Sequence, residues 1–196
     1  MGKVRESGMP EESYWDSFFD AAGMLSQLGC TSRTGDVVEF GCGYGTFTIP
    51  AAEMVAGTVH ALDIDPAMTA IVDSKARRQR LSNIVCEVRD FVTDGSGLPD
   101  GTADLALLFN ILHIEDPVAL LREARRTLSP AGRVAIVHWR NDVHTPRGPS
   151  LAIRPSQVQC RQWGEAAGLT FERFDPLSCC AWHWGLVMSR PAIRQS

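Results

Sequence analysis

Three acidic side chains stand where an apolar run of the sequence gives way to a turn. Glu39 comes just before a glycine cluster, Asp63 ends the run at residues 58–63, and Asp90 follows the run at residues 84–88. A carboxylate accepts hydrogen bonds from amino groups and hydroxyls but repels a pyrophosphate. Together the three acids favour a ligand that is cationic near the glycine cluster and carries a ribose and an adenine further along, because such a ligand leaves no buried charge unpaired.

The glycine cluster allows the backbone to approach a ligand closely. Gly41, Gly43 and Gly45 alternate with larger residues, and glycine has no Cβ and adopts positive φ readily. A dinucleotide fingerprint, G-x-G-x-x-G, requires glycine at position 46, where this chain has Thr46. A nicotinamide-dependent oxidoreductase is therefore disfavoured, although it stays open as an alternative class of enzyme.

An alternation of strands and helices is needed to bring these residues together. Apolar runs predict strands at residues 36–40, 58–63, 84–88, 103–109, 132–139, 169–174 and 181–188. Strand and helix alternate along most of this span, which predicts an α/β fold: a single Rossmann-like, doubly wound, seven-stranded sheet, mostly parallel, with helices on both faces. The last strand follows its predecessor without a helix, so it is expected to be antiparallel. Ligands bind such sheets beyond the carboxyl ends of the strands, where the three acids would converge.

Local signals predict where several helices begin. Asp65 and Asp116 each precede a proline, which combines an N-cap with a favoured first helical residue, and Ser156 opens a capping box. An aromatic stripe at helical spacing predicts one amphipathic helix over residues 11–29. Residues 140–155 form a long irregular stretch, and loops of this length in compact domains are often functional.

The strand ends resemble the motifs of the class I S-adenosylmethionine-dependent methyltransferases, in particular short type-11 and type-25 members of unassigned substrate. The resemblance covers about residues 36–140 and rests on VVEFGCGYG (37–45), ALDID (61–65), VRDF (88–91), FNILH (109–113) and LSPAGRVAIVHW (128–139). It implies S-adenosyl-L-methionine as cofactor. Arg89 and Ala131 stand where many relatives have glycine, but neither change removes an expected cofactor contact.

This resemblance implies a role for each motif residue. Glu39 would hold the methionine end of the cofactor, partly through its amino group. Asp63 would accept hydrogen bonds from the ribose hydroxyls and Asp90 from the adenine N6 amine, while Ile64 and Phe91 would lie against the adenine. The other residues expected to bind the cofactor are Gly41, Cys42, Gly43, Gly45 and Asn110.

The acceptor is less defined than the cofactor. A sulfonium already makes the methyl group electrophilic, so the protein mainly has to align a nucleophile and exclude water. The fourth motif reads Asn110-Ile-Leu-His rather than the N/D-P-P-Y/F that relatives use on adenine amines and glutamine amides. A small-molecule O, S or C nucleophile is therefore expected. A non-catalytic protein that binds the cofactor remains an alternative.

Histidines and aromatic residues are the candidates for the acceptor side. His113 and His138 are the candidate catalytic residues, because imidazole titrates in the range needed for a general base. Both are expected to face the acceptor, as is His183 from the last strand. The first helix is expected to bring Tyr14 or Trp15 over the site.

Charge and composition argue against several classes of partner. The chain has 196 residues, with 19 basic against 23 acidic and a net charge of -4, so nucleic acid and anionic membrane surfaces are not expected as partners. Residues 1–13 lack the apolar core of a secretory signal, which predicts a soluble, cytoplasmic protein. We expect one domain over residues 11–190, between a disordered leader (1–10) and a flexible tail (191–196), as a monomer or homodimer.

The 6 cysteines lack the spacing of a metal site, so no metal is expected. The vicinal pair Cys179-Cys180, together with Cys42, leaves open a thiophilic acceptor such as an arsenical. Buried, unreactive thiols are the favoured interpretation.

Overall fold

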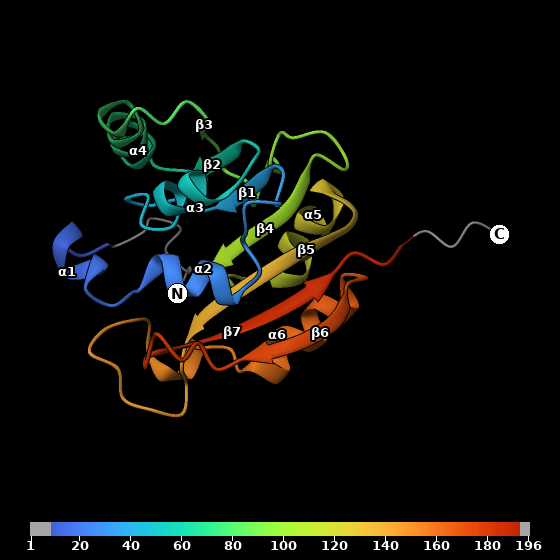
Figure 1. The fold of residues 1–196 in the computed structure, drawn as a ribbon. Coiled ribbons are helices and arrows are strands. Elements are labelled where there is room, and N and C mark those ends of the chain that lie inside the picture. Colours follow the sequence, from blue (N-terminus) through green and yellow to red (C-terminus); the bar gives the residue numbers. More distant parts are fainter. Residues whose placement is uncertain (1–8, 193–196) are drawn as a thin grey trace.

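The computed structural model describes residues 9–192, so residues 1–8 of the expected leader and 193–196 of the expected tail lie outside the described part. Its centre is a 7-stranded sheet in the order β3-β2-β1-β4-β5-β7-β6 (Figure 1). The strands are β1 (Val37–Phe40), β2 (Val59–Asp63), β3 (Ile84–Val88), β4 (Ala103–Phe109), β5 (Leu128–Trp139), β6 (Thr170–Asp175) and β7 (His183–Ser189). β1 to β5 pair in parallel, and β7 lies antiparallel between β5 and β6, which confirms the predicted fold.

Helices cover both faces of the sheet. They are α1 (Glu12–Asp16), α2 (Ala21–Gln27), α3 (Thr48–Met54), α4 (Pro66–Gln79), α5 (Pro117–Thr127) and α6 (Gln157–Ala166), with a short 3-10 helix η1 (Leu151–Ile153). α2 and α3 lie on one face of the sheet and α5 and α6 on the other (Figure 1). Their apolar residues belong to two separate core clusters. Asp65, Asp116 and Ser156 accept hydrogen bonds from the first-turn amides of α4, α5 and α6, as their sequence signals predict.

The prediction of one helix over residues 11–29 is wrong, because the segment forms two helices. α1 ends at Asp16, and the side chain of Asp20 accepts a hydrogen bond from the Gly23 amide as the N-cap of α2. The break between the helices lets Phe18 become buried while Trp15 and Phe19 pack around Trp139 of β5. The aromatic stripe therefore reflects one cluster built from two short helices.

Candidate active site

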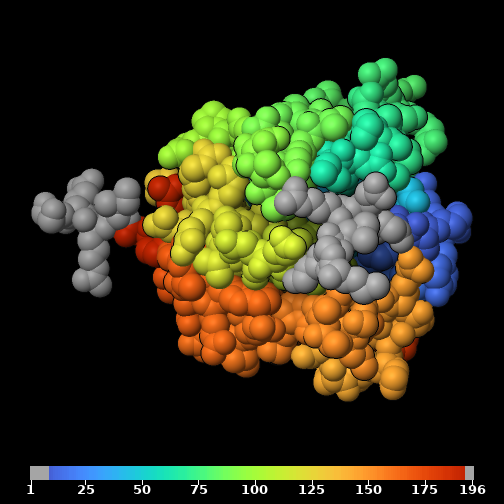
Figure 2. Space-filling view, turned by 180° about the vertical axis from the view of Figure 1, so that it is seen from behind, coloured from blue at the N-terminus to red at the C-terminus, as the bar shows by residue number. Residues whose placement is uncertain are grey.

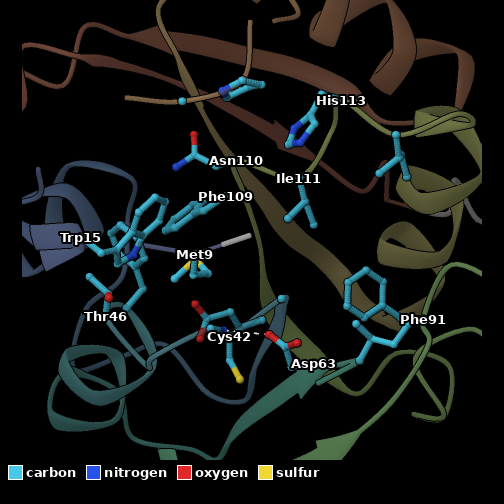
Figure 3. A pocket seen from close by; sticks show the side chains of 18 of the residues that line it. Met9, Trp15, Cys42, Thr46, Asp63, Phe91, Phe109, Asn110, Ile111 and His113 are labelled. Carbon is cyan, nitrogen blue, oxygen red and sulfur yellow. Dashed lines mark hydrogen bonds between the residues drawn. The ribbon is translucent and has the colours of Figure 1, made fainter. Parts of the chain in front are cut away.

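A cavity of about 480 Å³ lies at the carboxyl ends of the central strands. The strand order reverses between β1 and β4, the point in a doubly wound sheet where ligands bind. Glu39, Asp63 and Asp90 all line this cavity, so the structure brings the three acids together as predicted. Figure 3 shows Asp63 and Cys42 on one side of Met9, and Asn110 and His113 on the other.

Glu39 is the most deeply buried acid of the site. It lies on β1, its side chain is 2% exposed, and the hydroxyl of Thr48 donates a 2.5 Å hydrogen bond to its Oε2. Burial raises the pKa of Glu39 to about 8, the Thr48 hydrogen bond opposes this increase, and the nearby Asp63 adds to it. A cationic group placed against Glu39 would favour its ionised form.

Asp63 joins the end of β2 to the glycine cluster. Its Oδ2 accepts a 2.9 Å hydrogen bond from the Gly43 amide, and its Oδ1 accepts one of 3.0 Å from the Asp65 amide. Burial raises the pKa of Asp63, and these amide hydrogen bonds oppose the rise. Each carboxylate oxygen has a second lone pair, which suits a pair of ligand hydroxyls.

The glycine cluster has the backbone conformation that its sequence predicts. Gly41 has φ +82 and Gly43 has φ +50, and both line the cavity. A Cβ at Gly43 would come within 3.1 Å of the Cε of Met9. Gly45, with φ +79, lies outside the cavity lining, and a Cβ there would meet Val72 of α4 at 3.0 Å. Gly45 therefore allows the turn to pack closely against α4.

The third acid lies beside an apolar surface. Ile64 and Phe91 both line the cavity, and Phe91 packs edge-on to Phe40 with ring centroids 5.4 Å apart. Asp90 accepts hydrogen bonds from the Val92 amide and from the hydroxyl of Thr93. This surface, with a hydrogen-bond acceptor at its edge, suits a flat heterocycle that carries an amino group.

Arg89, which precedes Asp90, contacts the loop that follows β3. Its Nε donates to the Gly95 carbonyl at 2.9 Å, and its Nη2 donates to the Asp94 carbonyl at 2.9 Å. Arg89 therefore orders the loop after β3, and Asp90 still lines the cavity.

The far end of the cavity is aromatic. Trp15, Phe109 and Trp139 line it together with Asn110 and His113. Asn110 has φ +59, its buried Oδ1 has no hydrogen-bond partner among the described residues, and its Nδ2 lies 3.5 Å from Nε2 of His183. An unpartnered buried carbonyl oxygen on a cavity wall is ready to accept a hydrogen bond from a ligand.

Three of the residues expected on the acceptor side do not line the cavity. His138 is fully buried, with its ring stacked 6.2 Å from Trp184, because the next residue of β5, Trp139, faces the cavity and side chains alternate along a strand. His183 lies behind Asn110 with its Nδ1 3.1 Å from the Sγ of Cys180. Tyr14 is 46% exposed and points away from the lining.

Burial also sets the charge of the two hidden histidines. It lowers the pKa of His138 to about 3, with His113 contributing, and it lowers the pKa of His183 to about 3, with Arg154 contributing. Both imidazoles are therefore neutral near pH 7. Of the three candidate histidines, His113 is the one that lines the cavity.

The first helix was expected to bring Tyr14 or Trp15 over the site, and Trp15 lines the cavity, but the part played by the residues just before this helix was not predicted. Met9 and Pro10 line it, the Tyr44 hydroxyl donates to the Pro10 carbonyl at 2.9 Å, and the Thr46 hydroxyl donates to Asp16 at 2.7 Å. These contacts join residues more than 25 positions apart, so no local pattern reveals them. Residues 147–149, which also line the cavity, belong to the irregular stretch 140–155 that was expected to be functional, whereas Trp139 was not predicted.

The cysteines do not form a common site. Cys42 lines the cavity, whereas Cys179 and Cys180 belong to the apolar cluster around α2. Burial raises the pKa of each of these three thiols. No group of at least 3 metal-ligating side chains occurs within residues 9–192.

Comparisons with known proteins identify the family of this chain. The family described as "Methyltransferase domain" matches residues 37–132. The chain is 32% identical over 160 residues to an uncharacterized 37.1 kDa protein in transposon TN4556 of Streptomyces fradiae, covering 78% of this chain and 46% of that protein. It is 35% identical over 102 residues to the aklanonic acid methyltransferase DauC of Streptomyces sp. (strain C5), covering 50% of this chain and 46% of that enzyme. The chain thus spans less than half the length of these two relatives.

The fold has solved counterparts as well. A SAM dependent methyltransferase from Aquifex aeolicus superimposes with a TM-score of 0.79 at 22% identity, over 92% of this chain and 94% of that one. This chain belongs to the class I S-adenosylmethionine-dependent methyltransferases, and S-adenosyl-L-methionine is the cofactor of that family. The buried Glu39 suits the ammonium of that cofactor, and Asp63 suits its ribose hydroxyls. Family membership removes the nicotinamide-dependent alternative.

Proposed function

We propose that this protein transfers a methyl group from S-adenosyl-L-methionine to an O, S or C nucleophile of a small molecule. The observation that carries the proposal is the composition of one cavity, which has three acids at one end and aromatic walls at the other. The acidic end matches the polar groups of the cofactor. The aromatic end provides an apolar compartment for an acceptor. The name of the aklanonic acid methyltransferase, which gives a small-molecule substrate, supports this class of acceptor.

The residues of this chain would bind and orient the two reactants. Glu39 would pair with the ammonium, Asp63 with the ribose hydroxyls and Asp90 with the adenine amine, while Ile64 and Phe91 flank the ring. When bound, the cofactor supplies an electrophilic methyl group at its sulfonium. Positioning and exclusion of water are the main contributions left to the protein.

The aromatic wall would supply that exclusion of water. Trp15 packs edge-on to Trp139 with ring centroids 6.3 Å apart, so the leading segment and β5 meet across the far end. Asn110 would accept a hydrogen bond through its Oδ1. His113 would hydrogen-bond the acceptor or take its proton, and His138, 5.5 Å behind it between ring centroids, would position it.

A labelled-methyl transfer screen tests the proposal. The purified chain is incubated with methyl-labelled S-adenosyl-L-methionine and panels of thiols, phenols, carboxylates, quinols and arsenite, with Asp63→Asn as the matched control. We expect transfer to one panel and a loss of at least tenfold in the control. Cofactor binding by calorimetry without transfer to any panel would favour the non-catalytic alternative.

The oligomeric state and the cellular location need separate measurements. No helix within residues 9–192 is long and apolar enough to cross a membrane. A cytoplasmic location and a monomeric or homodimeric state, both expected from the sequence, stay predictions. Light scattering of the purified protein and fractionation of the producing cell measure them.

A further inference from the structure

Charge is unevenly distributed along the cavity. Its acids are Glu39, Asp63 and Asp90, and all three lie at the cofactor end, where Arg89 also lines the cavity and donates hydrogen bonds to the Gly95 and Asp94 carbonyls. The far end is lined by aromatic and apolar side chains, by Asn110 and His113, and by the loop residues Arg147, Gly148 and Pro149. Among the described residues, the far end therefore presents cationic and neutral groups and no carboxylate.

A second arginine lies directly behind this wall. Arg154 is 8% exposed, and its guanidinium carbon lies 5.9 Å from the ring centroid of Trp139. A Cβ at Gly148 would come within 2.9 Å of Cγ of Trp139 and 3.0 Å of Nη2 of Arg154. The charge of Arg154 is thus separated from the cavity by one layer of side chains.

The partners of Arg154 are neutral. Its Nε donates to the Pro149 carbonyl at 2.8 Å, its Nη1 to the Arg140 carbonyl at 2.8 Å, and its Nη2 to the Arg147 carbonyl at 3.2 Å. No carboxylate within residues 9–192 forms an ion pair with it. A buried cation held only by carbonyl dipoles is costly, and a nearby anion would lower that cost.

Two histidines and two acids also lie near Arg154. His138 and His183 are buried and neutral near pH 7, as described above. Glu115 and Asp116 share a neighbouring hollow with Arg154, formed between residues 112–118 and 152–163, but both acids are exposed to solvent there. Figure 2 shows the yellow surface of the first segment adjoining the orange surface of the second. Solvent screens those two acids, as it screens the exposed Arg147, so the buried Arg154 is the least screened of these charges.

We propose that the methyl acceptor is an organic acid with a flat apolar body, bound as its anion at the Arg147 and Arg154 end of the cavity. This inference rests on the proposed methyl transfer. The aromatic walls of Trp15, Phe109 and Trp139 would hold the apolar body. The two arginines would attract the ionised group, whether carboxylate, phenolate or enolate.

Methyl transfer to such an anionic acceptor needs no general base. An electron pair on the anionic oxygen or carbon forms the new bond to the methyl carbon, and the bond from that carbon to sulfur breaks with its electron pair left on sulfur. The negative charge of the acceptor and the positive charge of the sulfonium disappear together, and no proton has to leave. His113 would then donate or accept a hydrogen bond rather than remove a proton. An ammonium acceptor would instead bring a cation to a cationic end and would have to lose a proton first.

Binding of matched naphthalene compounds tests the charge preference without turnover. Titration calorimetry compares 2-naphthoate, 2-naphthamide and 2-naphthylmethylammonium against the protein saturated with S-adenosylhomocysteine. We expect the carboxylate to bind at least tenfold more tightly than the other two, and the difference to shrink as salt is added. Equal binding of all three, or tighter binding of the ammonium compound, would overturn the proposal.

Activity assays with substituted arginines locate the source of that preference. Methyl transfer to 2-naphthoate, 2-naphthol and an enolised β-diketone distinguishes the three kinds of anion, and the panel includes the corresponding amines. For the best acceptor, Arg147→Gln and Arg154→Met should each raise KM about tenfold, with kcat changed little. Arg154→Lys should retain most of the binding. Arg78→Gln, which removes an exposed arginine from α4, is the matched control and should leave KM unchanged.

The outcomes separate this inference from the function on which it rests. Transfer to amines or neutral alcohols alone, or the same KM in Arg147→Gln as in the wild type, would overturn the acid preference and leave methyl transfer in place. A protein that binds no S-adenosylmethionine would overturn the proposed function itself. Arg147 lies on an exposed loop, so its variant decides the question even where Arg154→Met fails to fold.

Discussion

Replacing Glu39 by glutamine should remove a pH dependence from both stability and cofactor binding. Burial of this side chain, which is 2% exposed, raises its pKa from 4.5 to about 8. Glutamine has nearly the same shape, keeps an oxygen to accept the Thr48 hydroxyl and does not ionise. The ligand-free variant should therefore be more stable than the wild type at pH 9 and should bind the cofactor more weakly there.

The raised pKa determines the sign and size of the effect on stability. The contribution of the Glu39 proton to the free energy of unfolding is fully present below pH 4.5, where the side chain is protonated in both folded and unfolded chains. It is lost progressively as the pH rises from 4.5 through about 8. At 1.36 kcal/mol per pH unit, the difference between the two pKa values corresponds to an upper limit of about 5 kcal/mol. About 3 kcal/mol of this should be lost between pH 6 and pH 9, where the wild type loses stability and Glu39→Gln does not.

The effect on binding follows from the same proton. Below pH 8 the free protein has to release the proton of Glu39 before the carboxylate can pair with the cofactor ammonium. The ratio of wild-type to Glu39→Gln affinity should therefore grow up to about tenfold per pH unit well below the pKa, and about 50-fold from pH 6 to pH 8, where half of the side chain is ionised. The amino group of the ligand titrates in the same way with both proteins, so the ratio of the two affinities reports the ionisation of Glu39 alone.

Calorimetry with S-adenosylhomocysteine at pH 6, 7 and 8 measures the affinities, and urea unfolding at pH 6 and pH 9 measures the stabilities. Glu53→Gln, an exposed position on α3, is the control for removing one negative charge. Parallel pH curves for wild type and Glu39→Gln in both experiments would refute the reasoning, because they would mean that Glu39 is ionised throughout this range.

Three further predictions follow from other contacts. Asp63→Ala removes the acceptor of the Gly43 amide and should weaken S-adenosylhomocysteine binding about 100-fold by calorimetry, with Asp63→Asn less affected. Hydrogen bonds from Arg126 and Ser96 lower the pKa of Glu123 to about 2, so the stabilisation they give is present above pH 4.5 and lost as the pH falls through about 2. Because Arg126 is partly solvated, Glu123→Gln should lower the free energy of unfolding in urea by only about 1–2 kcal/mol at pH 7. Near pH 2 the same substitution should change it little. Gly148→Ala, at φ +111 and against Trp139, should raise the acceptor KM several-fold in the transfer assay while the cofactor Kd stays unchanged.

The strands and most helix starts were predictable because their signals are local. A buried parallel strand is a continuous apolar run, and Asp65 or Asp116 followed by proline can be recognised within two positions. The break between α1 and α2 was missed, although Asp20 is itself an N-cap residue type. The aromatic spacing across that break matched a helix by coincidence, since the rings meet through tertiary packing around Trp139.

The site was predictable only where chemistry coincides with a strand end. Glu39, Asp63 and Asp90 line the cavity because parallel strands deliver their carboxyl ends to one edge. The choice between His138 and Trp139 was not predictable, because β5 is buried on both faces and its apolar run carries no alternation that would show which residue faces the cavity. Met9 reaches the site from a segment whose sequence carries no local signal of that position, and the stretch 140–155 was expected to be functional without any sign that Arg154 would lie behind Trp139.

The two proposals together pair the charged side chains in and behind the cavity with the charges of the two reactants. The acids lie where the proposed binding mode places the ammonium and hydroxyls of the cofactor, and Arg147 and Arg154 lie where an ionised acceptor would bind. Methyl transfer to an anion removes one negative charge at the far end and the sulfonium charge beside it. The methylated acceptor no longer attracts Arg147 or Arg154, so it should leave more readily than the acid entered. In the proposed binding mode S-adenosylhomocysteine would keep its contacts to Glu39 and Asp63, which predicts that it, rather than the methylated acceptor, is the inhibitory product.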